Sequence, residues 1–297
     1  MIDRCCISIT EKCNLRCRYC HFSTEGRRSR DMTEDEIGSV ISAIRGYVSA
    51  HDIQFKVGIV GGGEPLLRFD MLKHIVEELG ADSRIRMYTI SNGVGVDDKK
   101  LEFLWENRDS IEYSVSLDGG ETLHDMNRID RSGRGTFSAV MGTIQRYEIL
   151  FGHKPSVNCT ITPAHLAEGE KVIRFFSDNG FRKVTFSRLF DSEDKVLSTE
   201  FDEFLEKASG YLEIRQLRKN RTYDCTQYGA LCGVGRTNIY FASGLAYPCA
   251  RFAGMERYCI GSVDDSLDAI EANLKQISPC DDGQCYYDQY VKIGGLQ

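Results

Sequence analysis

Strand-like runs alternate with amphipathic helical patterns along the first two thirds of this chain, and that alternation constrains the fold more than any other feature. The strand-like runs are RCCISI (4–9), IQFKVGIV (53–60), IRMYTIS (85–91), IEYSVSL (111–117), SVNCTIT (156–162) and KVTFSRL (183–189). The helical patterns between them cover residues 33–48, 68–80, 97–107, 137–150 and 164–180. Strands separated by such helices form βαβ units, so the sequence predicts an α/β fold with six strands in a parallel sheet or barrel.

A change in composition divides the chain near residue 217. A helical pattern covers residues 200–217, and beyond residue 220 the chain becomes rich in Cys, Gly and Tyr, with short strands such as TNIYFAS (237–243). We therefore predict two domains: a barrel domain over residues 1–217 and a small Cys-rich α+β domain over residues 218–297.

The composition is that of an ordinary globular protein and argues against two classes of partner. With 297 residues, 41% of them hydrophobic, the chain can bury a large core. The net charge of −7 disfavours nucleic acid and membrane surfaces, because phosphate-rich partners are usually met by a basic face. No apolar run approaches the roughly 18 residues of a membrane span, and MIDRCCISIT lacks a signal-peptide core, so we expect a cytoplasmic protein.

Three of the twelve cysteines, Cys13, Cys17 and Cys20, lie close together directly after the first predicted strand. A reducing compartment does not favour structural disulfides, so clustered cysteines indicate a metal. Parallel α/β folds place their active sites at the carboxyl ends of the strands. Three thiolates can hold three irons of a [4Fe–4S] cluster and leave the fourth iron open. The alternative is a zinc knuckle completed by His21 or by a distant cysteine.

The spacing C-x-x-x-C-x-x-C, with Tyr19 before the last cysteine, resembles the signature of the radical S-adenosylmethionine (SAM) enzymes. The resemblance implies a partial (β/α)6 TIM-type barrel and a [4Fe–4S] cluster held by Cys13, Cys17 and Cys20, whose open iron binds the amino and carboxylate groups of SAM. In that family, reductive cleavage of SAM gives methionine and a 5′-deoxyadenosyl radical that abstracts hydrogen from the substrate. The same resemblance implies a flavodoxin or ferredoxin as the reductant.

A glycine triplet follows the second predicted strand in IVGGGEPLL (59–67). Three consecutive glycines let the backbone approach a ligand where a side chain would obstruct it. The resemblance places this segment against the amino group of the SAM methionine and gives binding roles to Gly61, Gly62, Gly63, Glu64 and Pro65. A tight turn would explain the glycines alone, but it would not explain the whole GGGEP motif one βα unit after the cysteines.

Residues at the ends of the third, fourth and fifth predicted strands share an expected contact with SAM by the same resemblance. They are Ser91 and Asn92 at the SAM pocket, Ser116 and Asp118 near the ribose, and Thr160 and Ile161 at the adenine edge. Arg128, in LHDMNRID, matches an arginine that can pair bidentately with the SAM carboxylate, although a surface role is nearly as compatible with the sequence.

A second cysteine field lies in the predicted small domain. Its members are Cys225, Cys232, Cys249, Cys259, Cys280 and Cys285. The spacing from Cys232 through Gly244 to Cys249 resembles the opening of the SPASM and twitch auxiliary-cluster domains. Because the closing motif PCDDGQC is shorter than that of a full SPASM domain, the resemblance implies one auxiliary [4Fe–4S] cluster.

The ligand set of the auxiliary cluster is left open by the sequence. The candidates are Cys232 and Cys249, then Cys285, with Cys280 (twitch precedent) or Cys225 (SPASM precedent) as the fourth. The spare cysteine, or Cys259, could give a hydrogen atom to a substrate radical, and a structural role for Cys259 is equally compatible. The remaining cysteines, Cys5, Cys6 and Cys159, are predicted to be packing residues.

The stretch SLDGGETLHDMNRIDRSGRGTF (116–137) resembles the matching region of sulfatase-maturing enzymes and peptide maturases. The leading hypothesis is therefore a radical SAM enzyme that abstracts hydrogen from a residue of a ribosomally made peptide and cross-links, epimerises or oxidises it. The alternatives are a twitch-type dehydrogenase of a small molecule such as an aminocyclitol, and activation of a sulfatase-like target. Because the chain starts at the first strand, we expect no fused N-terminal peptide-recognition domain; a leader peptide would be held by the barrel and tail or by a separate protein.

Overall fold

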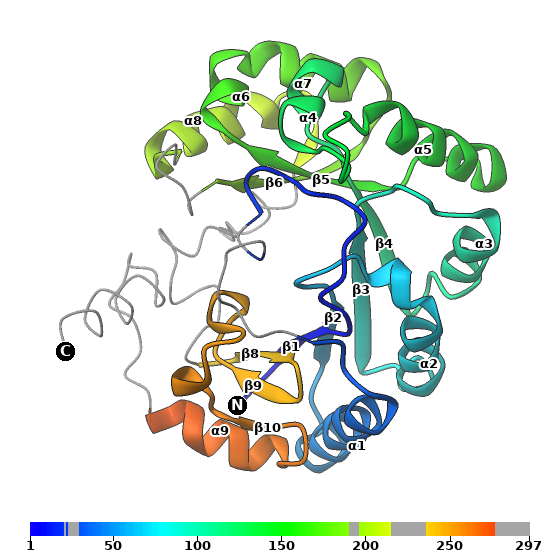
Figure 1. Cartoon of the computed structure of the whole chain (residues 1–297). Helices are drawn as coiled ribbons and strands as arrows, with labels where there is room; N and C mark the ends of the chain where they lie inside the picture. Colours follow the sequence, from blue (N-terminus) through cyan, green and yellow to red (C-terminus); the bar gives the residue numbers. More distant parts are fainter. Residues whose placement is uncertain (21, 23–29, 190–195, 215–235, 277–297) are drawn as a thin grey trace.

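Figure 1 shows the computed structural model of the chain, which describes residues 1–20, 22, 30–189, 196–214 and 236–276. Six parallel strands form the centre of its sheet, and each pairs with the next one in sequence. They are β1 (Arg4–Ser8), β2 (Phe55–Ile59), β3 (Ile85–Ser91), β4 (Ile111–Ser116), β5 (Ser156–Ile161) and β6 (Lys183–Arg188). The predicted α/β fold with six parallel strands is confirmed, and each strand lies within the run that predicted it.

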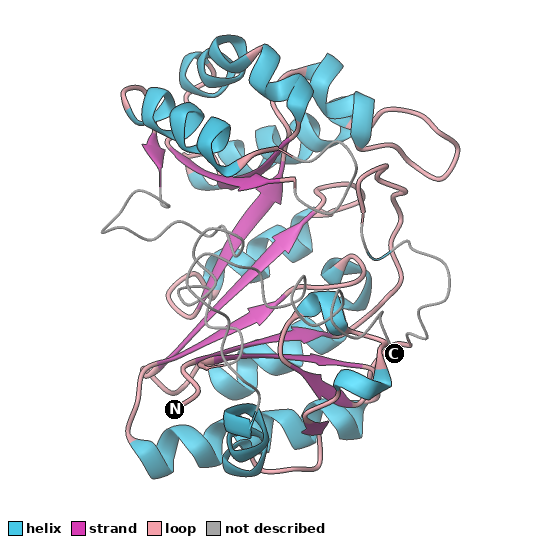
Figure 2. Ribbon diagram, turned by 90° about the vertical axis from the view of Figure 1, so that its left-hand side faces the viewer, coloured by secondary structure: helices cyan, strands magenta, loops and turns pink. Residues whose placement is uncertain are grey.

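The helices surround the outer face of this sheet in an arc, as expected for a partial barrel (Figure 1). They include α1 (Glu34–His51), α2 (Phe69–Leu79), α3 (Asp98–Glu106), α4 (Glu121–Asn127), α5 (Phe137–Phe151) and α8 (Ser198–Ser209). Figure 2, a quarter-turn away, shows the strands fanning apart, so the sheet is strongly twisted. None of the described helices is both long and apolar enough to cross a membrane.

The sequence begins α1 with a capping box. The Thr33 side chain accepts a hydrogen bond from the backbone N–H of Glu36, and the Glu36 carboxylate accepts one from the N–H of Thr33. Two of the four N–H groups that a helix start leaves unpaired are thereby satisfied. The buried face of α1 then repeats at helical spacing through Ile37, Val40, Ile41, Ile44 and Val48.

The pattern over residues 164–180 does not form one helix as predicted. It forms α6 (Pro163–Ala167) and α7 (Gly169–Asp178), because the backbone of Glu168 takes φ −111° and ψ 25° between them. The predicted helix over 200–217 also ends early: α8 stops at Ser209, and the chain continues into the short strand β7 (Glu213–Ile214) beside β6. Helix α4 was not predicted, since ETLHDMN is too short to show a clear helical period.

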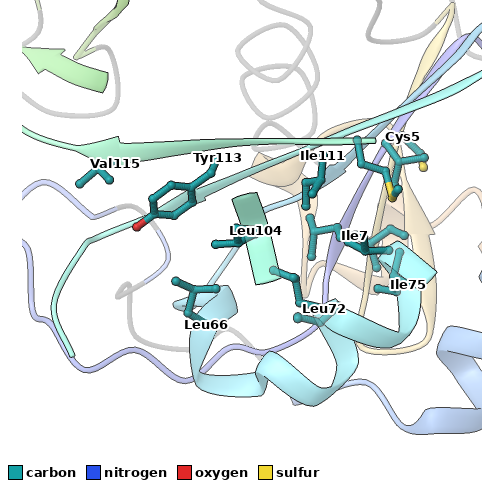
Figure 3. Close-up of a cluster of buried hydrophobic side chains, with 14 of the residues drawn as sticks. Cys5, Ile7, Leu66, Leu72, Ile75, Leu104, Ile111, Tyr113 and Val115 are labelled. Atoms are coloured by element: carbon teal, nitrogen blue, oxygen red, sulfur yellow. The ribbon is translucent and has the colours of Figure 1, made fainter. Parts of the chain in front are cut away.

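Buried aliphatic side chains fill the space between the sheet and the helices. Figure 3 shows Ile7 of β1, Ile75 of α2 and Ile111 of β4 in one such cluster, together with Cys5. Complete burial of each aliphatic side chain contributes roughly 1.5–3 kcal/mol. Cys5 and Cys159 are both 1% exposed and belong to this core, so their prediction as packing residues is confirmed.

Strands from the predicted small domain extend the same sheet beyond β1. Within the described residues the strand order is β10-β9-β8-β1-β2-β3-β4-β5-β6-β7. β8 (Asn238–Ala242) runs parallel to β1, while β9 (Leu245–Tyr247) and β10 (Gly261–Ser262) follow antiparallel. Helix α9 (Leu267–Gln276) contacts α1, which Figure 1 shows beside it. The predicted boundary at residues 217/218 lies outside the described ranges and stays a prediction.

Candidate active site

A cavity of about 400 Å³ lies at the carboxyl ends of the six parallel strands. The predicted site residues that line it are Cys13, Cys17, Tyr19, Cys20, Gly61, Gly62, Gly63, Glu64, Asn92, Ser116, Arg128 and Thr160. These residues come from loops and strand ends that are far apart in sequence, and the parallel strands carry them to one rim. All three cysteines and the glycine triplet therefore lie at the rim where the sequence predicted them.

The cysteine loop is tied to the end of α4 and to the segment that follows it. The backbone N–H groups of Arg16 and Arg18 donate to the carbonyl oxygens of Ile129 (2.8 Å) and Asn127 (2.9 Å). The guanidinium of Arg131 donates through Nη2 to the carbonyl of Cys13 at 2.9 Å. A loop that carries three potential ligands is thus held in place by backbone hydrogen bonds.

Two nitrogen atoms lie close to the thiol of Cys13. The N–H of Leu15 lies 3.4 Å from the sulfur of Cys13, and the Nδ2 of Asn92 lies 3.7 Å from it. Burial, with further contributions from Cys20 and Cys13, raises the pKa of the Cys17 thiol to about 11, although Arg128 acts in the opposite direction. A thiolate at this position would therefore need a compensating positive charge, which a bound metal ion would supply.

No group of three or more His, Cys, Asp or Glu side chains is arranged around a single metal-ion position within the part of the chain that the structure describes. His21, which the zinc-knuckle alternative needs, lies outside the described residues. The three thiols nevertheless line one cavity, as a shared polynuclear cluster would require.

The glycine triplet packs against the cysteine loop as well as lining the cavity. A Cβ atom on Gly63 would overlap the carbonyl oxygen of Lys12 and lie 2.7 Å from that of Thr10. At Gly62 a Cβ atom would overlap the carboxylate of Glu11. The sequence explained the triplet by the approach of a ligand; the structure adds a close approach of protein to protein, which also requires glycine.

Glu64 joins three loops through its buried carboxylate and its backbone N–H. Its Oε2 accepts from the N–H of Asn92 at 2.7 Å and its Oε1 from the N–H of Leu66 at 3.1 Å, while its own N–H donates to Lys12 at 2.8 Å. Burial raises the pKa of Glu64, and these backbone N–H groups oppose that effect. Glu64 therefore fixes the relative positions of the loops after β1, β2 and β3. The neighbouring Pro65 is buried at the start of a 3-10 turn and does not line the cavity.

Asp118 lies behind the cavity wall rather than in it. The residue is 0% exposed, and its carboxylate accepts from the Tyr19 hydroxyl, from Arg128 Nε (2.8 Å) and from the N–H of Thr160 (2.9 Å). Burial alone would raise the pKa of Asp118, but the charge of Arg128 and these donors hold it below its ordinary value. The contact of Asp118 with the ribose stays a prediction. Its hydrogen bonds to the cavity-lining residues Tyr19, Arg128 and Thr160 are present in the structure.

His165 supports Asp118 from α6. Its Nε2 lies 3.0 Å from the carbonyl oxygen of Asp118, and its Nδ1 lies 3.3 Å from the backbone N–H of Thr162. The Asp118 carbonyl can only accept and the Thr162 N–H can only donate, so His165 is the neutral Nε2–H tautomer. His165 lies in α6, so this short helix carries the side chain that contacts the backbone just after β4.

The two remaining predicted SAM contacts, Ser91 and Ile161, are buried and do not line the cavity. Ser91 is fully buried and accepts from the N–H of Gly93 at 3.0 Å, and Ile161 is a core residue. Sequence reasoning also missed several residues that line the cavity: Phe22, Val60, Ile90, Asn158, Ser187, Arg188 and Leu189. The last three end β6, so the rule that placed the other strand ends at the rim could have found them.

The second cysteine field is described only in part. Cys249 and Cys259 both pack on a small cluster around Tyr240, Tyr247 and Phe252, and Phe22 from the cysteine loop packs on the same cluster. The thiol of Cys259 donates to the carbonyl of Gly261 at 2.9 Å. The other predicted auxiliary ligands, Cys225, Cys232, Cys280 and Cys285, lie outside the described residues.

Known proteins resemble this chain over most of its length. It is 24% identical over 293 residues to a cysteine-type anaerobic sulfatase-maturating enzyme of Clostridium perfringens, covering 85% of this chain and 75% of that enzyme. The structure of anSMEcpe with bound AdoMet and the Cp18Cys peptide matches it with a TM-score of 0.74 at 18% identity, covering 91% of this chain and 80% of the other. Streptococcus suis SuiB bound to its precursor peptide SuiA gives 0.72 at 14% identity, covering 98% and 73%. At these identities the structural matches establish the fold.

The family assignment rests on the barrel half of the molecule. The Radical SAM superfamily model matches residues 7–163, from β1 to the start of α6, which is more than half of the chain. The match includes the three cysteines, the glycine triplet and the Asp118 network at the cavity. Members of this family bind a [4Fe–4S] cluster and SAM. The chain belongs to the Radical SAM superfamily.

Proposed function

We propose that this protein uses a SAM-derived 5′-deoxyadenosyl radical to abstract a hydrogen atom from a residue of a ribosomally made peptide. The observation that carries the proposal is the single cavity that brings three cysteine thiols, the glycine triplet and the ends of the central strands together. Three thiols can hold three irons of a four-iron cluster, which leaves the fourth iron free for a small ligand.

Different residues around the cavity would bind the cluster and the parts of SAM. Cys13, Cys17 and Cys20 would hold three irons, and the bound cluster and SAM would supply the electron transfer and radical chemistry. Arg128 lines the cavity, is held by Asp118, and would bind the carboxylate of SAM. Asn92 and Thr160 line the same cavity and would contact the rest of the cofactor. Glu64 holds the loops together and also lines the cavity, so it would contact the cofactor as well.

The peptide as substrate class is supported by the relatives. The similar Clostridium perfringens protein is named for maturation of sulfatases, and the two matched structures contain bound peptides. Cross-linking, epimerisation and oxidation of a residue all begin with hydrogen abstraction, so the class of product stays open. A separate leader-recognition protein and a flavodoxin or ferredoxin reductant complete the proposed partners.

The proposal includes one auxiliary [4Fe–4S] cluster in the region after residue 218. Cys249 follows the hairpin of β8 and β9, and Phe22 connects its surroundings to the cavity wall. Cys249 would be one of the residues that hold this cluster, and the bound cluster would supply an electron acceptor. Oxidation of a small molecule would use the same arrangement and is the second candidate function.

Mass spectrometry distinguishes these functions. Reduced, iron-loaded protein is incubated with SAM and candidate precursor peptides in deuterated water. A gain of one mass unit in the peptide indicates epimerisation, and a loss of two indicates cross-linking or oxidation. Formation of 5′-deoxyadenosine with an aminocyclitol, and with none of the peptides, would instead support the small-molecule dehydrogenase. A sulfatase-derived peptide is included to test the sulfatase-maturase alternative.

A further inference from the structure

Four hydrogen bonds join Asp118, His124, Thr136 and Arg128 into a closed ring behind the cavity. The Asp118 N–H lies 3.2 Å from His124 Nδ1, and His124 Nε2 lies 3.1 Å from Thr136 Oγ1. The Thr136 hydroxyl donates to the Arg128 carbonyl at 2.8 Å, and Arg128 Nε donates to Asp118 Oδ2 at 2.8 Å. The ring connects the end of β4 to both the backbone and the side chain of Arg128.

The direction of every bond in the ring follows from its obligatory donors and acceptors. The Asp118 N–H can only donate, so His124 Nδ1 must accept. The hydroxyl proton of Thr136 is used on the Arg128 carbonyl, so His124 Nε2–H must donate to Thr136. His124 therefore has to be neutral and in the Nε2–H form for the ring to close. His124 is 0% exposed, and burial lowers its pKa to about 4, which keeps the required form populated at neutral pH.

The ring holds Arg128 at two points while leaving its outer end available. Its carbonyl is fixed by Thr136 and its Nε by Asp118, and Arg128 lines the cavity. Neither of its Nη atoms donates a hydrogen bond to another residue in the described ranges. A free arginine side chain carries about 2 kcal/mol of rotamer entropy, and a side chain already fixed loses less of it on binding a ligand.

We propose that His124 and Thr136 are positioning residues that hold the Arg128 guanidinium in the orientation needed to bind the carboxylate group of the cavity's ligand. This inference rests on the proposed binding of SAM in the cavity. The resemblance to known enzymes gave a role to Arg128 in LHDMNRID but none to His124. The proposal gives His124 a physical role. Neither positioning residue touches the cavity, so both act only through Arg128 and Asp118.

The test compares Thr136→Val with Thr136→Ser. Valine keeps the shape of threonine but removes the hydroxyl, so it breaks two bonds of the ring, whereas serine keeps the hydroxyl. Binding of SAM to iron-loaded protein is measured without reductant by calorimetry, and thermal unfolding is followed in parallel. We expect Thr136→Val to lose about tenfold in SAM affinity, and Thr136→Ser to stay within about twofold of the parent.

A ligand without the carboxylate separates positioning from general damage to the fold. 5′-Methylthioadenosine has the adenosine and sulfur of SAM but no amino acid carboxylate, so its affinity should be the same in the parent and in both variants. Equal SAM affinity of the parent and Thr136→Val, or an equal loss of both ligands, would overturn the positioning role. If the parent itself binds neither ligand, the assignment of the cavity fails and the inference fails with it.

Discussion

Gly63 lies so close to Lys12 that a Cβ atom at position 63 would overlap the Lys12 carbonyl oxygen. The same carbonyl accepts the N–H of Glu64 at 2.8 Å. The glycine triplet therefore packs directly against the loop that carries Cys13, in addition to lining the cavity. Since backbone atoms cannot rotate away as a side chain can, any side chain at position 63 must displace the cysteine loop itself.

Substitution of the two adjacent glycines should accordingly have different effects. Gly63→Ala meets the backbone of Lys12 and Thr10, whereas Gly62→Ala meets only the end of the flexible Glu11 side chain. We expect Gly63→Ala to destabilise the protein by about 1–3 kcal/mol and to retain clearly less iron after anaerobic reconstitution. Gly62→Ala should retain nearly the iron of the parent. Equal iron contents in the two variants would contradict this account of the triplet.

The proposed auxiliary cluster can be tested by counting iron. A protein with two [4Fe–4S] clusters holds about eight irons. Cys17→Ala should remove the cluster at the cavity and abolish 5′-deoxyadenosine formation under dithionite, because Cys17 is one of the three cavity thiols. Cys249→Ala should also lower the iron content but retain some SAM cleavage.

Cys159→Ala is the matched control for both cysteine variants, since Cys159 is buried in the core and lines no part of the cavity. Its iron content and its SAM cleavage should equal those of the parent. An iron content near half of the expected value in the unmodified protein would refute the auxiliary cluster, whereas loss of iron in Cys159→Ala would show that the measurement reports folding rather than ligation.

Most of the fold could be predicted because strand and helix periods are local properties of the sequence. IRMYTIS predicted β3 with its observed bounds, since its apolar alternation is bordered by turn residues on both sides. The break at Glu168 could not be predicted in this way. The helical pattern predicted over residues 164–180 runs through Glu168, so it contains no sign of the φ −111° and ψ 25° that the backbone takes there. Tertiary context can interrupt a helix without leaving a periodic signal in the sequence.

The sequence predicted which residues lie at the candidate site but not the hydrogen bonds that connect them. The end of each parallel strand reaches the same rim, so Cys13, Gly62 and Asn92 could be placed there from their positions alone. The sequence could not indicate that Asp118 is saturated by Tyr19, Arg128 and Thr160, because these donors come from three different segments. For the same reason, no role for His124 could be predicted from the sequence.

The stability of the protein should fall between pH 6.5 and pH 4 because of its buried histidines. An unfolded histidine has a pKa near 6.5, whereas burial lowers the pKa of His124 to about 4, with Asp118 and Asp125 opposing that effect and Arg128 adding to it. The unfolded chain then binds more protons than the native protein over this range, so the stabilisation is complete above about pH 6.5 and is lost as the pH falls toward 4. This difference corresponds to about 3 kcal/mol for His124.

Urea unfolding at a series of pH values measures this effect. His124→Gln should be less stable than the parent at pH 7.5, and its stability should fall less steeply between pH 6.5 and 4, because the glutamine cannot take up a proton. His74→Gln is the control, since His74 is exposed on α2 and its replacement should leave the slope unchanged. Parallel pH profiles for the parent and His124→Gln would show that His124 is not the group responsible.

Replacement of Glu64 by glutamine should uncouple the loops after β2 and β3. Both carboxylate oxygens accept backbone N–H groups, those of Asn92 and Leu66, but glutamine offers one oxygen and one NH2 group of the same shape. One backbone N–H would then face another donor. We expect a loss of about 1–3 kcal/mol in the free energy of unfolding and weaker SAM binding, because Asn92 lines the cavity.

Two effects compete in this variant, and their sizes decide the outcome. Burial raises the pKa of Glu64, so a neutral glutamine avoids part of the cost of burying a charge. A net loss of stability would therefore mean that the unpaired N–H group costs more than the buried charge. Glu36→Gln is the control: Glu36 also accepts a backbone N–H, that of Thr33, at 2.8 Å, and it pairs with Arg30, but it lines no part of the cavity. Its replacement should cost about 1 kcal/mol or less and should not alter SAM binding, whereas equal effects of the two variants on SAM binding would remove Glu64 from its place at the cavity.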